Sequence, residues 1–288
     1  MPDLIENLIA AGPVVTDGAW GTQFLDAGLE PGEPADAWNL LHPERVEAVA
    51  RSYVDAGSRI ILTNTFRSNR IALAGHGLAA KLEAINSAGV VISRRAAAGR
   101  ALVFASMGTS GKLLLSGEIT PEELSDVFAE QARALAAAGA DAIVLETMTD
   151  LAETTLAIRA ARQTGLPVIA SMVFDSGKDQ DRTMMGATPE QVAAELTTAG
   201  ADVIGANCGQ GIEGYVAICR RLQAATGLPL WIKANAGLPE LAEGRPQYRT
   251  TPAEFAAHVP ALVEAGADFI GGCCGTTPDF IRAVLKAL

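Results

Sequence analysis

The amino-acid sequence predicts a single α/β domain, a (β/α)8 or TIM barrel whose active site lies at the carboxyl-terminal ends of its strands. Two observations predict this fold. Eight short apolar segments alternate with Ala- and Leu-rich segments of helical character along the 288 residues. Seven of the eight also follow a glycine-containing turn, as in Ala138-Gly139-Ala140-Asp141 and Ala199-Gly200-Ala201-Asp202.

The apolar segments are predicted to be parallel strands covered on both faces, since such strands are apolar throughout instead of alternating with polar residues. In order, they comprise residues 14–17, 60–64, 102–107, 142–146, 168–173, 203–207, 230–234 and 269–272. The first opens the barrel, and the turns before the other seven carry Gly57, Gly99, Gly139, Gly165, Gly200, Gly227 and Gly266. Glycine suits the left-handed position just past a helix, so each turn ends one helix and leads into the next strand. A last helix is predicted over residues 279–288.

The composition fits one domain, residues 1–288, without a linker or a low-complexity break. Hydrophobic residues make up 49% of the chain, which is enough for a large core. The net charge of −11 gives no general attraction for nucleic acid or an anionic membrane, so neither is expected as a partner. The first residues lack the basic region of a secretory signal, and no apolar run reaches the roughly 18 residues of a membrane span. We therefore expect a cytoplasmic protein with reduced cysteines.

Polar residues gather just after the predicted strands, where barrel enzymes carry their chemistry. The loops that leave the strands include the long ones, at residues 18–43, 174–188 and 236–251. The polar residues at strand ends are Asp17, Asn64, Glu146, Asp175, Asn207, Cys208, Asn235, Cys273 and Cys274. Helix capping is the alternative role for the Asp and Asn residues. Their convergence on one rim predicts a functional site, because unpaired polar groups are costly at the ends of buried strands.

Three of the four cysteines form the most specific pattern. Cys273 and Cys274 lie between glycines, at Gly271-Gly272 and Gly275, and these flanks allow both sulfurs to face one ion. Cys208 ends the sixth predicted strand, two strands away from the pair. Three thiolates form a soft site that suits Zn2+ and leave a tetrahedral ion one open position, as catalytic zinc sites do. A vicinal redox disulfide, or cysteines packed as small hydrophobic residues, are the alternatives.

The open zinc position is predicted to receive a thiol substrate. None of His42, His76 and His258 follows a strand closely enough to fill it, and Cys219, in a helical segment, is predicted to be a packing residue. A free thiol has a pKa of about 8.5, whereas a metal-bound thiol is deprotonated outright. A sulfur held among three protein thiolates stays electron-rich, which favours attack on an electrophilic methyl group.

Six motifs spread over essentially the whole chain resemble the homocysteine S-methyltransferase family, and most closely the homocysteine-binding module of cobalamin-dependent methionine synthase. They are Asp17-Gly18-Ala19-Trp20-Gly21-Thr22, Ile61-Leu62-Thr63-Asn64-Thr65-Phe66, Leu145-Glu146-Thr147, Gly205-Ala206-Asn207-Cys208-Gly209, Asn235-Ala236-Gly237-Leu238-Pro239 and residues 271–278. The cysteine pair between glycines, together with the upstream Asn-Cys, is the most specific of them.

The resemblance implies that Cys208, Cys273 and Cys274 bind zinc and that Glu146 binds the amino group of homocysteine. A barrel-interior ion pair is the alternative role for Glu146. The resemblance also implies that the loop at Asp17 holds the amino-acid end of the substrate, partly through backbone N–H groups. The candidate catalytic residues are Asp17, Glu146 and Asn235, and the candidate substrate-binding residues are Asp17, Gly18, Ala19, Trp20, Asn64 and Glu146.

The resemblance implies that zinc-bound homocysteine is methylated to methionine, but it leaves the methyl donor open. In one hypothesis a small free donor, such as S-methylmethionine, a betaine or another sulfonium, enters the same mouth. Trp20 would then hold the cationic donor by cation–π attraction, with packing under the loop as its alternative role. In the other hypothesis a separate methyl-corrinoid protein docks on the barrel. A zinc barrel hydrolase or aldolase is a further alternative, but such sites usually use histidine and carboxylate ligands.

Overall fold

The eight predicted strands are present and form one parallel sheet in the computed structural model, which describes residues 4–30, 32–242 and 245–288. The order of the strands is β1-β10-β7-β6-β5-β4-β3-β2. Their bounds are β1 (Val14–Val15), β2 (Ile60–Ile61), β3 (Leu102–Met107), β4 (Ala142–Met148), β5 (Val168–Met172), β6 (Val203–Gly211), β7 (Leu230–Asn235) and β10 (Ala267–Gly272). The prediction of a (β/α)8 barrel is therefore confirmed, although β1 and β2 are shorter than predicted.

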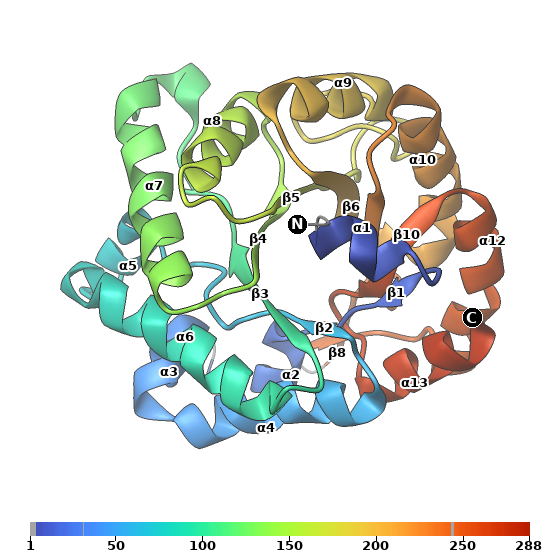
Figure 1. Cartoon of the computed structure of the whole chain (residues 1–288), viewed down its shortest axis with the longest axis horizontal. Coiled ribbons are helices and arrows are strands. Elements are labelled where there is room, and N and C mark those ends of the chain that lie inside the picture. Colours follow the sequence, from blue (N-terminus) through green and yellow to red (C-terminus); the bar gives the residue numbers. More distant parts are fainter. Residues whose placement is uncertain (1–3, 31, 243–244) are drawn as a thin grey trace.

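At least one helix follows each strand and packs against the outside of the sheet (Figure 1). These helices are α4 (Pro43–Ala56), α6 (Leu82–Ala97), α7 (Pro121–Ala137), α8 (Leu151–Arg162), α9 (Pro189–Ala199), α10 (Ile212–Ala225), α11 (Pro252–Ala257) with α12 (Val259–Glu264), and α13 (Pro278–Ala287). Within the described ranges, no helix combines the length and apolar character needed to cross a bilayer.

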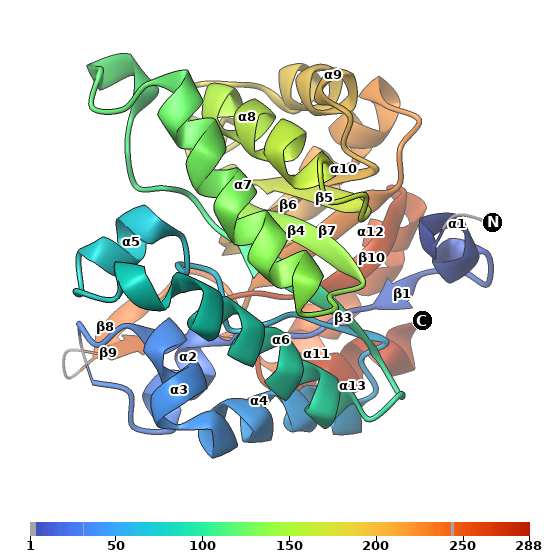
Figure 2. The same cartoon turned by 60° about the vertical axis from the view of Figure 1, so that its left-hand side comes forward.

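Additional elements cover the two ends of the barrel (Figure 2). Helix α1 (Leu4–Ile9) lies at one end, where Ile5 and Leu8 pack into the barrel interior. The other end carries α2 (Gly21–Asp26), α5 (Arg70–Ala74) and a hairpin of β8 (Glu240–Ala242) with β9 (Arg245–Gln247). The remaining short elements are α3 (Trp38–Leu41), η1 (Ala35–Ala37), η2 (Ala79–Lys81) and η3 (Leu114–Ser116). The hairpin occupies the segment that we predicted only as a long loop.

Four helices begin with a threonine followed by proline, and three of these threonines form a capping box. Thr120, Thr188 and Thr251 each accept a hydrogen bond from the backbone N–H three residues later, and the Glu or Gln at that position bonds back to the threonine N–H. Such capping boxes satisfy N–H groups that the first turn of a helix leaves free. Proline at the first helical position suits this geometry because it has no N–H to satisfy. The helices after β3, β5 and β7 therefore begin at defined points.

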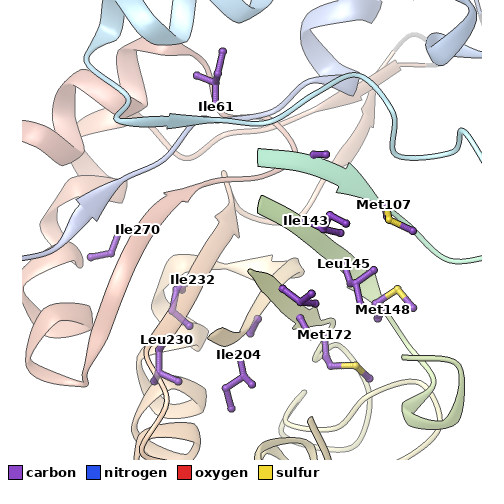
Figure 3. Packing of buried hydrophobic residues seen from close by; sticks show 14 of the residues in the cluster. Ile61, Met107, Ile143, Leu145, Met148, Met172, Ile204, Leu230, Ile232 and Ile270 are labelled. Carbon is purple, nitrogen blue, oxygen red and sulfur yellow. The ribbon is translucent and has the colours of Figure 1, made fainter. Parts of the chain in front are cut away.

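The strands separate two hydrophobic cores. Side chains that point outward, including Ile61, Ile143, Leu145, Ile232 and Ile270, pack beneath the helices (Figure 3). Alternate residues point inward and fill the barrel, where Trp231 lies between Phe104 and Phe269 with ring centroids 6.2 Å and 5.5 Å away. Successive side chains on a strand face opposite sides of the sheet. The residue two positions after each inward apolar residue therefore also points inward.

This next inward layer is polar. The pairs of successive inward residues are Phe104 and Ser106, Val144 and Glu146, Ile169 and Ser171, and Trp231 and Lys233. The apolar residues plug the amino-terminal part of the barrel, and the polar residues lie toward the carboxyl ends of the strands. The carboxyl-terminal part of the barrel interior is therefore polar and lies on an apolar base.

Strands β1 and β2 close the barrel without a regular ladder. The backbone N–H of Arg59 donates to the carbonyl oxygen of Val15 at 2.8 Å, just before β2 begins. Closer to the mouth, the backbone N–H of Leu62 donates to Oδ2 of Asp17 at 2.7 Å. The Asp17 side chain thus supplies an acceptor at the point where the two strands separate, and this contact fixes the carboxylate at the barrel rim.

Candidate metal centre and substrate pocket

A cavity of about 650 Å3 lies at the carboxyl-terminal end of the strands. Its wall includes the sequence-predicted residues Gly18, Ala19, Trp20, Asn64, Glu146, Cys208, Cys273 and Cys274. Asp17 and Asn235 do not line the wall but are buried and contact residues that do. Asp175, also at a strand end, is exposed. The structure therefore brings eight of the ten predicted site residues to one cavity and places the other two behind its surface.

The three predicted zinc ligands meet at this cavity. The sulfur atoms of Cys208, Cys273 and Cys274 all lie within 4.8 Å of one another, and those of Cys208 and Cys274 are 4.0 Å apart. Cys208 lies in β6 and the pair follows β10, and β7 pairs with both strands. Cys219 is fully buried in α10 and donates to the carbonyl oxygen of Ala265, which agrees with its predicted packing role.

The backbone at Cys208 has an unusual conformation that aims its side chain at the pair. Its φ of 63° lies in the left-handed region, where residues other than glycine are uncommon. The pairing of β6 with β7 also shifts between Asn207 and Gly211. The hydroxyl of Tyr215 donates to the Cys208 carbonyl at 2.5 Å and holds this turn. Strained residues of this kind are often kept at functional sites.

The three thiols share protons unequally. Hydrogen bonds from Cys273 and Cys274 lower the pKa of Cys208 well below that of an ordinary thiol. The hydrogen bonds to Cys208 raise the pKa of Cys273 and the pKa of Cys274, and burial adds to both increases. Within the cluster, Cys208 is therefore the thiol that loses its proton most readily.

The sulfur cluster fits a zinc ion. Two sulfurs that each lie about 2.3 Å from one tetrahedral ion are about 3.8 Å apart, close to the separation of Cys208 and Cys274. The side chain of Asn235 donates to Cys208, but its Oδ1 atom is buried without a hydrogen-bond partner. A buried oxygen left unpaired on a side chain that contacts Cys208 requires an explanation, and an ion bound at the cluster would supply one. In the described part of the chain, no other group of three His, Cys, Asp or Glu residues is clustered as closely.

Glu146 lies on the cavity wall at an irregularity in β4. The β4–β5 register shifts between Leu145 and Met148, and Thr147 has a positive φ of 58°. Asn207 stabilises this bulge, since its Oδ1 accepts from the Thr147 N–H at 2.8 Å and its Nδ2 donates to the Thr147 hydroxyl at 2.8 Å. Nδ2 also lies 3.9 Å from the sulfur of Cys273. Asn207 therefore links the position of Glu146 to the sulfur cluster.

The carboxylate of Glu146 is partly buried on the cavity wall. Burial raises its pKa, while the positive charge of Lys233 and a hydrogen bond from Ser106 act in the opposite direction. A buried carboxylate gains most from a cationic partner, because such a partner compensates for the lost hydration. Glu146 can thus receive an ammonium group that enters the cavity.

Asp17 uses both oxygens within the protein. Its Oδ1 accepts from the ammonium of Lys233, and its Oδ2 accepts from the Trp20 indole N–H at 2.7 Å and from the Leu62 backbone. Asp17 is fully buried and Lys233 is 2% exposed, so they form an interior ion pair. Asp17 thereby fixes the orientation of the Trp20 ring on the cavity wall.

The loop after Asp17 packs tightly against the motif that carries the cysteine pair. A Cβ atom on Gly18 would lie 2.8 Å from both the Thr276 hydroxyl and the Tyr53 ring, so this position has no room for a side chain. The backbone N–H of Ala19 donates to the Thr276 hydroxyl at 3.1 Å, and its carbonyl accepts from the Tyr53 hydroxyl at 2.6 Å. The Ala19 N–H is therefore already used within the protein.

Asn64 also has a defined structural role. Its Nδ2 donates to the carbonyl of Ala35 at 2.8 Å and to Oδ1 of Asn39 at 3.0 Å. Asn39 in turn donates to the Asn64 carbonyl at 2.6 Å. These bonds tie the loop after β2 to the segment between α2 and α3, which forms another part of the cavity wall. Asn64, a candidate substrate-binding residue, therefore also orients this loop.

Comparison with known proteins assigns the barrel to a family. Residues 14–288 match the model of the homocysteine S-methyltransferase family. The chain belongs to the homocysteine S-methyltransferase family. The family predicted from the sequence motifs is therefore confirmed.

Two methionine synthases are among the curated relatives of this homocysteine S-methyltransferase family member. The chain is 33% identical to the methionine synthase of Mycobacterium leprae and 31% identical to that of Mycobacterium tuberculosis, over 99% of its own length in both cases. It spans about a quarter (25%) of the length of each relative. The similarity thus concerns one part of those longer proteins.

Solved structures of a homocysteine methyltransferase, MmuM from Escherichia coli, have the same fold. The oxidised form matches with a TM-score of 0.82 at 23% identity, covering 99% of this chain and 100% of that one. The metallated form matches with a TM-score of 0.80 at 24% identity and 96% coverage of both chains.

Two residues of this family member's site were missed by sequence analysis. Lys233 lies inside the seventh predicted strand, and a charged residue in an otherwise apolar strand was the signal that could have found it. Tyr248, in the segment after β9, donates to Cys274, and its ring packs on Gly275, where a Cβ would lie 2.2 Å from the ring. No motif or period marks Tyr248, because its position depends on the hairpin β8–β9.

Proposed function

We propose that this chain transfers a methyl group to the sulfur of homocysteine, with a zinc ion held by Cys208, Cys273 and Cys274. The observation that carries the proposal is the convergence of three sulfurs within 4.8 Å on the wall of a cavity that also contains Glu146. The family supports homocysteine as the acceptor. When bound, the zinc ion supplies the Lewis acidity that keeps a thiol ionised at neutral pH.

The protein residues orient the acceptor and keep water away from it. Glu146 receives the ammonium group of homocysteine, and the hydrogen bond from Ser106 holds the carboxylate in place. The apolar floor at Trp231 and Phe104 excludes water beneath the reacting sulfur. A carbon–sulfur bond then forms as the bond between the methyl carbon and the donor breaks, and its electron pair leaves with the donor. The thiol proton passes to solvent before this step.

We further propose that the donor is a small onium compound that enters the same cavity. A volume of about 650 Å3 is more than homocysteine needs, since pockets of about 300–1,000 Å3 hold drug-sized ligands. The wall formed by the loops after β1 and β2 is rich in apolar residues, including Trp20, Phe24, Phe66 and Leu73. An aromatic face attracts a cationic methyl donor.

A separate methyl-corrinoid protein is the second candidate donor. The similarity to the two methionine synthases favours it, because 99% of this chain matches part of those proteins. In that case the cavity mouth is the surface at which the partner delivers the methyl group.

A donor screen tests the proposal. Zinc-loaded protein is incubated with homocysteine and one of S-methylmethionine, S-adenosylmethionine, glycine betaine, dimethylsulfoniopropionate or methylcobalamin, and the methionine formed is measured. We expect methionine from at least one onium donor, with none from Cys273→Ser protein. Activity with methylcobalamin alone would favour the corrinoid route, and no methionine from any donor would contradict both.

A further inference from the structure

Lys233 is a buried cation with more hydrogen-bond donors than protein acceptors. Its ammonium carries three N–H groups, and the side chain is only 2% exposed. One N–H donates to Oδ1 of Asp17. Across residues 4–30, 32–242 and 245–288, no second acceptor lies within hydrogen-bond distance of this nitrogen. Unpaired donors at such depth are costly, so this arrangement indicates a site that a ligand completes.

Lys233 borders the same cavity as the proposed substrate site. The cavity wall includes Lys233, Glu146, Gly18 and the three cysteines. The charges of Lys233 and Glu146 are close enough to influence each other, since Lys233 opposes the rise in the pKa of Glu146 that burial causes. The wall therefore presents a cation, a carboxylate and a sulfur cluster to one ligand.

A ligand carboxylate at the inner wall of the cavity also needs a positively charged partner. The carboxylates of Asp17 and Glu146 both contribute negative charge at the inner wall. A carboxylate placed there without a positive partner would meet like charges in a site of low dielectric, where repulsion is strong. Among the described residues, Lys233 and Arg67 are the lysine and arginine that line the cavity. Arg67 is exposed, so Lys233 is the one that can offer a buried positive charge.

We propose that Lys233 binds the carboxylate of an α-amino-acid thiol, so that the acceptor is recognised at its sulfur, its ammonium and its carboxylate. The proposal rests on the proposed function and deepens it, because it makes Lys233 the residue that distinguishes amino-acid thiols from simple thiols. Asp17 is then a positioning residue, which holds the Lys233 ammonium on one side and the Trp20 ring on the other.

A purely structural Lys233, present only as the counter-ion of Asp17, gives a different expectation. Loss of Lys233 would then weaken the binding of every thiol ligand equally. All these ligands bind the sulfur cluster through their thiol and differ only in the groups at the opposite end of the molecule. The two roles separate when the same protein is tested with a thiol that has the carboxylate and one that lacks it.

The test compares homocysteine with 3-mercaptopropylamine, which is homocysteine without its carboxylate. Binding to cobalt-substituted protein is followed by the thiolate-to-cobalt absorption, so no methyl donor is needed. We expect Lys233→Met to weaken homocysteine binding about tenfold or more, as for loss of a buried charge partner, and to change 3-mercaptopropylamine binding less than about threefold. Lys233→Arg, which keeps the charge, should retain part of the preference for homocysteine.

Equal weakening of both thiols in Lys233→Met would overturn the proposal, as would wild-type protein that does not prefer homocysteine. If the lone Asp17 carboxylate prevents Lys233→Met from folding, the double variant Asp17→Asn with Lys233→Met removes both charges and serves the same comparison. Wild-type protein that responds to neither thiol would instead overturn the proposed function, and the role of Lys233 with it.

Discussion

The sulfur atoms of Cys208 and Cys274 lie 4.0 Å apart although 66 residues separate them in the chain. Strand β7 pairs with both β6 and β10, and it holds the two cysteine-bearing segments at a fixed spacing. The left-handed turn at Cys208 supplies the remaining adjustment. The barrel fold therefore brings the sulfurs of the cluster together, and the following predictions depend on that geometry.

Each of the variants Cys208→Ser, Cys273→Ser and Cys274→Ser should lose most bound zinc and most methyltransfer activity. A serine hydroxyl is a poor ligand for zinc in such a thiolate site. The two cysteines that remain in each variant should therefore bind the ion weakly. Zinc content and methionine formation are the measurements, with thermal unfolding to show that each barrel still folds. Cys219→Ser is the matched control, since this buried cysteine lies outside the cluster. Zinc and turnover retained in all three cluster variants would refute the site.

Zinc binding at pH 7 should release about two protons from the protein, because metal ligation requires thiolates. The lowered pKa of Cys208 leaves that thiol ionised, whereas the raised pKa values of Cys273 and Cys274 leave those two protonated. Apparent zinc affinity should therefore rise as pH rises from 6 toward 9, while the last two thiols lose their protons more easily. Calorimetry in two buffers of different ionisation enthalpy measures the released protons. Release of none would contradict this proton distribution.

Glu146→Gln should raise the KM for homocysteine about thirtyfold or more, as expected when a buried charge pair loses one partner. The same variant should change little with 4-mercaptobutyrate, which has no amino group. Steady-state kinetics with both thiols provide the comparison. An equal effect on the two substrates would show that Glu146 acts on the barrel and not on the ammonium group.

Trp20→Phe and Trp20→Leu separate two roles of one side chain. Phenylalanine keeps an aromatic face but loses the hydrogen bond to Asp17, whereas leucine loses both. If the ring attracts an onium donor, the KM for that donor should rise about fivefold with leucine and much less with phenylalanine. An unchanged donor KM in Trp20→Leu would contradict the proposed role of the ring.

Much of the fold was predictable because it depends on local patterns. All eight strands could be located from their apolar segments and from the glycines that end the preceding helices. Gly57 and Gly200 have the left-handed conformation expected after a helix. The cysteine cluster was also predictable, since the carboxyl ends of all the parallel strands in a barrel lie at one rim.

The unpredicted features depend on contacts between distant segments. Asp17 was expected to touch the substrate, yet its partners are fixed by the closure between β1 and β2, which no local pattern reveals. Lys233 escapes prediction because a strand covered on both faces is expected to be apolar throughout, although alternation from Trp231 places Lys233 inside the barrel. Tyr248 reaches Cys274 only because of the hairpin, whose strands are three residues long.

X-ray absorption at the zinc edge tests the central claim most directly, because it counts the sulfur atoms around the ion. The structure predicts three sulfurs at about 2.3 Å in the resting protein and four after homocysteine is added. The Cys219→Ser control should give the same counts as the wild type. Fewer than three sulfurs in the resting protein, or no increase with homocysteine, would contradict a three-cysteine site with one position open to the substrate thiol.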